Sequence, residues 1–219
     1  MITTNVKEFF EYLNRKCKYL VLRNWQGICD DSIYSDGHED IDILCDDLKS
    51  FLSLSGAQRI HKENNRDNFM VLIGNHSVRF DVRWIGDGYY PIEFEQLMLE
   101  HRVLNQSDIY VPSLEDYFYS LAYHALIQKP DLSSEYKSDL NKIYASFSNN
   151  KEELNRDQIL NILRDYLNTN GFEVVLPKDP GVFFNNRAAI LLPNRLDKTL
   201  QLKRRIFRIK QRLLSYLKV

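Results

Sequence analysis

The sequence DIDILC, residues 40–45, alternates acidic and aliphatic side chains for two cycles, and it decides the fold. Alternation with a period of two predicts a β-strand, with the carboxylates of Asp40 and Asp42 on one face. Residues two apart on a strand are separated by about 6–7 Å of rise, so these carboxylates repel each other unless a cation lies between them. Because carboxylate oxygens are hard ligands, the pattern predicts a Mg²⁺ or Mn²⁺ site.

A second charged strand is predicted at residues 77–85, SVRFDVRWI. Its alternation separates an apolar face from a charged face that carries Arg79, Asp81 and Arg83. If this strand lies next to 40–45, Asp81 joins the first two acids, and three carboxylates on adjacent strands can hold two cations. The alternative is that the acids lie at solvated strand ends and bind no metal.

Helical patterns surround these strands, at residues 5–16, 46–54 and 92–101, and then at 114–128, 133–147 and 156–168. A further short strand, FEVVL, is predicted at 172–176. The order predicts an α+β protein, in which a mixed β-sheet with flanking helices precedes a helical region. We expect a core over 1–110, a helical companion region over 111–198 that completes the cleft, and a tail over 199–219.

The composition is that of a globular protein, with 219 residues, 44% hydrophobic and 27% charged residues, and a net charge of −1. It excludes a wholly disordered or collagen-like chain. The N-terminal residues lack the basic and apolar regions of a signal peptide, and no apolar run is long enough to span a membrane. We therefore expect a cytoplasmic protein.

Four segments in order are similar to a known family: YLVLRNWQG, DIDILCDD, VRFDVRWIGDGYY and VPSLEDYFYSLAYHALIQKP. They resemble the nucleotidyltransferase fold of the DNA polymerase β superfamily. More narrowly, they resemble uncharacterised nucleotidyltransferase-like proteins of bacterial surface-polysaccharide biosynthesis. The resemblance covers residues 5–150 and, more weakly, 151–190. It implies that Asp40, Asp42 and Asp81 are catalytic and hold two Mg²⁺ ions, which promote attack of an acceptor hydroxyl on the α-phosphate of a nucleotide.

The chain departs from the superfamily after the first strand, where Gly-Ser is usual and Arg23 and Asn24 stand instead. Arg23 is a candidate to replace the backbone phosphate cradle with a bidentate guanidinium; the alternative is that the nucleotide binds differently. His38 lies in the loop just before the strand at 40–45 and is a candidate phosphate contact. The resemblance of YHALIQKP also suggests that Lys129 binds a phosphate and that His124 hydrogen-bonds across the cleft.

The last 21 residues, TLQLKRRIFRIKQRLLSYLKV, carry seven basic side chains and no acidic one, whereas the other 198 residues carry 22 basic and 30 acidic side chains. Aliphatic residues recur in the tail at spacings of three and four. This pattern predicts a basic amphipathic helix that binds an anionic membrane surface, as on the inner face of the cell membrane. The alternative is a terminal helix that docks its apolar face on the core. The acidic body opposes nucleic-acid binding.

The leading hypothesis is a metal-dependent transferase in surface-glycan (capsule) biosynthesis. It would move a nucleotidyl or phosphate-linked group from a nucleotide donor to a sugar or alditol hydroxyl. The alternative is a non-catalytic module of the same fold that senses a nucleotide or forms a scaffold. A third alternative, a nucleic-acid-modifying transferase, would require binding with a steep salt dependence.

Overall fold

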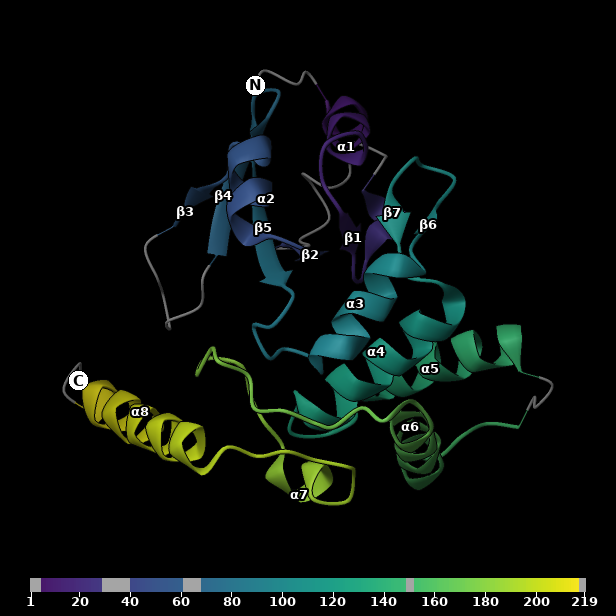
Figure 1. Ribbon diagram of the computed structural model, residues 1–219, viewed down its shortest axis with the longest axis vertical. Helices are drawn as coiled ribbons and strands as arrows, with labels where there is room; N and C mark the ends of the chain where they lie inside the picture. Colours follow the sequence, from purple (N-terminus) through teal and green to yellow (C-terminus); the bar gives the residue numbers. More distant parts are fainter. Residues whose placement is uncertain (1–4, 29–39, 61–67, 149–151, 217–219) are drawn as a thin grey trace. The chain divides into compact units, whose positions relative to one another are not determined.

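The computed structural model describes residues 5–28, 40–60, 68–148 and 152–216. It forms two compact units (Figure 1). The first unit comprises Met1–Gly86 and Ile92–Tyr117, and the second comprises Asp87–Pro91 and Phe118–Val219. The three-part division expected from the sequence, at residues 110 and 198, stays a prediction.

The first unit is built on a five-stranded mixed sheet with the strand order β1-β2-β5-β4-β3. Only the pair β2–β5 is parallel, and the other three pairs are antiparallel. The strands are β1 (Tyr19–Val21), β2 (Ile41–Cys45), β3 (Gln58–Arg59), β4 (Asn68–Ile73) and β5 (His76–Trp84). The predicted α+β class, a mixed β-sheet with flanking helices, is confirmed.

One face of this sheet is apolar and packs against α1 (Val6–Asn14) and α2 (Leu48–Ser55). Phe9 of α1 meets Phe80 of β5 edge to face, with ring centroids 5.8 Å apart. Both helices begin at a side-chain N-cap. The Asn5 side chain accepts a hydrogen bond from Glu8 N, and the Asp47 side chain accepts one from Ser50 N. Burial of this face leaves the charged residues of β2 and β5 on the opposite face.

The rest of the first unit lies beside β1 and β2. The helix α3 (Ile92–Glu100) contacts β2, and its buried Glu95 accepts from Gly86 N at 2.7 Å. A two-stranded sheet, β6 (Val103–Leu104) and β7 (Tyr110–Val111), follows, and β7 contacts β1. A short 3₁₀ helix, η1 (Trp25–Gly27), follows β1.

The second unit is mainly helical. It contains most of α4 (Leu114–Ile127), and then α5 (Ser134–Phe147), α6 (Arg156–Asn170), α7 (Asn186–Ala189) and α8 (Lys198–Tyr216). The α6 helix opens with a capping box of Asn155 and Gln158 and ends at Gly171, whose φ of 67° is left-handed. Figure 1 shows α8 as one continuous helix at the C-terminal end of the chain.

The strand predicted at 172–176 is not formed. Only Val174 makes a β-bridge, to Asn194, and its N–H donates to Pro193 O at 2.7 Å. The segment has strand-like residues but a single paired position, because the chain that runs beside it turns into a loop. No described helix is both long and apolar enough to cross a membrane.

Candidate functional site

Asp42 and Asp81 lie side by side on the charged face of the sheet. The register of the parallel pair sets Asp42 of β2 directly opposite Asp81 of β5. Residues opposite each other on neighbouring strands project to the same face. The adjacency that the sequence left conditional is therefore present in the structure.

Each of these two carboxylates forms an ion pair with an arginine. Arg23 Nε and Nη2 lie 3.1 Å and 3.0 Å from the two carboxylate oxygens of Asp42. Arg83 Nη2 lies 3.1 Å from Oδ2 and 3.0 Å from Oδ1 of Asp81. The four side chains are only 6–14% exposed, so the pairs are largely removed from water, where losing one partner is costly.

Asp40 precedes β2, and its carboxyl group responds electrostatically to both neighbours. Burial raises the pKa of Asp40, and the charges of Asp42 and Asp81 raise this pKa further, whereas Arg79 and Arg23 lower it. The three predicted acids therefore belong to one electrostatic cluster. We call this group, with Arg23, Arg79 and Arg83, the charged cluster.

The charged cluster fits a divalent cation in the kind of ligand that it offers, because three carboxylates supply hard oxygens. The positions of the carboxylates do not fit a cation. Within the described ranges, no group of three or more His, Cys, Asp or Glu side chains is positioned to hold a metal ion. Arg23 and Arg83 instead neutralise Asp42 and Asp81. A cation would therefore have to compete with two arginine pairs.

The turn after β1 explains how Arg23 reaches Asp42. Leu22 N donates to Asp42 O at 2.8 Å, which continues the β1–β2 pairing by one residue. Asn24 then adopts the left-handed conformation, with φ 57°. Asparagine tolerates this conformation better than most residues, so the chain makes the turn without the glycine of the superfamily pattern. The guanidinium of Arg23 is committed to a carboxylate here.

His124 lies in the second unit, in a buried hydrogen-bond network. Its Nδ1 is 2.8 Å from Gln128 Oε1 and 3.0 Å from Tyr89 Oη, and its Nε2 is 3.2 Å from Tyr136 Oη. Because the Gln128 amide donates from Nε2 to Tyr89 O, its Oε1 faces the histidine and accepts. Nδ1 therefore donates to Gln128 Oε1.

The remaining predicted site residues are less defined. Lys129 is half-buried two residues beyond α4. His38 lies outside the described residues. The substrate-binding roles of Arg23, His38, His124 and Lys129 stay predictions.

Sequence reasoning assigned no role to the other polar residues of the charged face. Arg83 pairs with Asp81, Arg79 acts on Asp40, and buried Asn68 of β4 lies opposite Asp81 in the antiparallel register. The signal was present in the alternation R-F-D-V-R of residues 79–83, which puts all three charged residues on the face of the acids. Two further features were missed: the network around His124 and a cavity beside α8.

Comparison with known proteins finds structural likeness but no match to a family or a curated protein. Among solved structures, the chain is similar to the antibiotic-resistance factor ANT(2'')-Ia, with 14% sequence identity, coverage of 74% of this chain and 89% of that chain, and a TM-score of 0.38. A likeness at this level assigns no substrate or catalytic residue to this chain.

Proposed function

We propose that the chain is a metal-dependent transferase of nucleotidyl or phosphate-linked groups. The donor would be a nucleotide or a nucleotide-linked compound, and the acceptor a sugar or alditol hydroxyl in surface-glycan biosynthesis. The proposal is supported chiefly by the register that sets Asp42 opposite Asp81, with Asp40 electrostatically coupled to both. Three carboxylates on one face of adjacent strands are costly unless cations offset their charge.

In this proposal Asp40, Asp42 and Asp81 hold the divalent ion, Mg²⁺ or Mn²⁺, after Arg23 and Arg83 have released the carboxylates. When bound, the ion would neutralise charge on the phosphate oxygens and favour ionisation of the acceptor hydroxyl. The released guanidinium of Arg23 would then be available to pair with phosphate oxygens. In the reaction, the acceptor hydroxyl would give up its proton to solvent and its oxygen would bond to the α-phosphorus. The bond from that phosphorus to the oxygen bridging to the β-phosphate would break, so that pyrophosphate leaves.

Release of pyrophosphate tests this reaction. The full chain is incubated with each of the common nucleoside triphosphates, Mg²⁺ and a panel of sugars and alditols. We expect acceptor-dependent pyrophosphate release that falls to the buffer rate in Asp40→Asn and is unchanged in Asp165→Asn, which alters an exposed acid of α6. Equal rates of pyrophosphate release in the two variants would show that the charged cluster takes no part in the reaction.

A second candidate function is a non-catalytic nucleotide-sensing or scaffolding module. One observation favours it: the arginine pairs already neutralise Asp42 and Asp81 without a metal ion. Such a module would bind a nucleotide with or without Mg²⁺ and release no pyrophosphate. Calorimetry with the same nucleotides, run beside the turnover assay, separates the two functions.

We also propose that α8 holds the protein against an anionic membrane surface. Leu202, Ile206, Ile209 and Leu213 recur on one side of α8, and each is more than half exposed. Basic side chains flank this stripe, and each lysine or arginine near an anionic surface contributes about 1 kcal/mol. Flotation with vesicles of phosphatidylcholine, with and without phosphatidylglycerol, tests this placement. Equal recovery with both vesicles would contradict it.

A further inference from the structure

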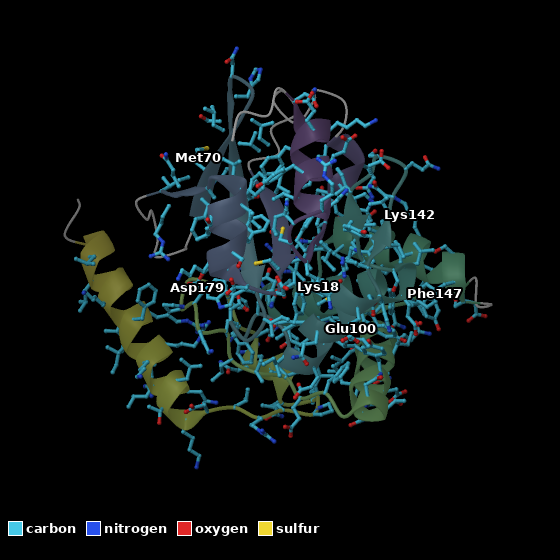
Figure 2. The ribbon with its side chains drawn as sticks, turned by 45° about the horizontal axis from the view of Figure 1, so that its top comes forward. Lys18, Met70, Glu100, Lys142, Phe147 and Asp179 are labelled. Carbon is cyan, nitrogen blue, oxygen red and sulfur yellow. The ribbon has the colours of Figure 1, made fainter. Side chains whose placement is uncertain are left out.

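The α8 helix docks on its own unit through a charged residue and leaves its aliphatic stripe exposed. Arg204 is 4% exposed, and its guanidinium donates to Pro177 O at 2.7 Å, Asp179 O at 2.6 Å and Val182 O at 2.5 Å. Figure 2 labels Asp179, which lies on the loop between Val174 and α7. Arg204 therefore fixes the N-terminal half of α8 to this loop.

Beside this contact lies a cavity of about 290 Å³, within the second unit. Besides Arg204, its walls are formed by apolar, amide and guanidinium side chains: Leu176, Phe184, Asn186, Gln201, Arg205 and Arg208. The volume is just below the range for small-molecule sites, about 300–1,000 Å³. The cavity therefore suits a small ligand.

The charged side chains that line the cavity are all arginines. Within the described part of the chain, neither Arg205 nor Arg208 forms an ion pair, and Arg208 lies 6.0 Å from the centroid of the Phe183 ring. The pKa of Arg204 is lowered to about 10, chiefly by burial and also by the charge of Arg208, while the charge of Asp179 acts in the opposite direction. Arginines that crowd one another in this way would be stabilised by a bound anion.

We propose that this cavity binds the phosphate group of a small phosphate ester. Arg205 and Arg208 offer planar guanidinium groups, which match the geometry of phosphate oxygens. Asn186 and Gln201 can donate to and accept from hydroxyl groups of the ester. Leu176 and Phe184 provide an apolar wall for its carbon atoms. The site rests on the second unit alone and is independent of the transferase proposed for the charged cluster.

Titration of the full chain with glycerol 3-phosphate, followed by calorimetry and by the shift in melting temperature, tests the site. We expect saturable binding that weakens about tenfold in Arg208→Gln, the loss of one charge-assisted contact. Lys210→Gln makes the same charge change on the same helix but outside the cavity wall, and it should weaken binding by less than about twofold. Gln201→Glu, which adds a carboxylate to the cavity wall, should abolish binding of glycerol 3-phosphate.

The phosphate can come from a soluble ester or from a phospholipid headgroup, and vesicles distinguish these sources. The vesicles are phosphatidylcholine alone, or equal parts of phosphatidylcholine and phosphatidic acid. Headgroups also enter the cavity if glycerol 3-phosphate releases wild-type protein, but not Arg208→Gln, from the vesicles that contain phosphatidic acid. Binding of glycerol 3-phosphate without such release would assign a soluble ester. Equal weakening in Arg208→Gln and Lys210→Gln, or no binding of either probe by the wild type, would overturn the proposal.

Discussion

Replacing Arg204 with methionine should detach α8 from the second unit. The substitution removes the donor of three hydrogen bonds, to Pro177 O, Asp179 O and Val182 O. One hydrogen bond to a charged group contributes about 1.5–3 kcal/mol, but removing the buried guanidinium also removes its desolvation cost. Each of the three carbonyls left without a donor costs about 1–3 kcal/mol, so after the desolvation gain we expect a net loss of about 3–5 kcal/mol from the docking of α8.

Hydrogen exchange followed by mass spectrometry measures this loss locally. Because about 1.4 kcal/mol corresponds to a factor of ten, amides of α8 should exchange at least about 100 times faster in Arg204→Met. The exchange rates of the α8 amides should rise no further than the rates of the undocked helix. Amides in the strands of the first unit should exchange at unchanged rates.

Arg205→Met is the matched control, because Arg205 is the exposed neighbour of Arg204 on the same helix. Its α8 amides should exchange as in the wild type. If Arg204→Met and Arg205→Met gave the same exchange rates in α8, the three carbonyl contacts would not be what holds the helix, and the reasoning would be refuted.

Three further predictions concern the first unit. Asn24→Ala should lower the free energy of unfolding by about 1–2 kcal/mol, because φ at this position is 57°, whereas Asn24→Gly should keep wild-type stability; urea denaturation compares them. Asp40→Asn should raise the free energy of unfolding at neutral pH by about 0.5–2 kcal/mol. Because the pKa of Asp40 is raised in the folded protein, the ionised carboxylate disfavours folding. The stability gained in Asp40→Asn should therefore vanish as the pH falls below the ordinary pKa of aspartate. Thermal melts across pH test this trend. Phe80→Ala should cost about 3–5 kcal/mol, because the ring is fully buried against Phe9; a cost below that of truncating half-exposed Phe183 would contradict the core assignment.

The faces of the two charged strands could be predicted from the sequence because alternation is a local signal. In β5, Phe80 and Val82 lie in the core, and Asp81 and Arg83 lie on the charged face. Alternation alone left the position of Asp81 beside Asp42 conditional, because strand order depends on contacts between distant parts of the chain. Arg23 as the partner of Asp42 was missed for the same reason, because the two residues are 19 positions apart. Arg83 lies two residues from Asp81 on the same strand, so this pairing was within reach of the local pattern.

The segments after residue 170 show where local patterns were insufficient. Val174 has strand-forming neighbours, but a strand also needs a partner, and only one bridge forms. The tail shows two faces in the sequence, yet nothing local says which of them docks. Docking uses Arg204, because three loop carbonyls converge on it, and so Ile206 and Ile209 stay exposed.

The central claim is that the charged cluster exchanges its arginine pairs for a divalent ion. Titration of Mn²⁺ into the full chain, with free Mn²⁺ read by electron paramagnetic resonance, tests it most directly. Asp40→Asn is the informative variant, because within the described residues Asp40 forms no ion pair whose loss would disturb the fold. We expect saturable Mn²⁺ binding in the wild type and in Asp165→Asn, and the loss of this binding in Asp40→Asn. The same Mn²⁺ affinity in all three proteins, or no binding in the wild type, would contradict it.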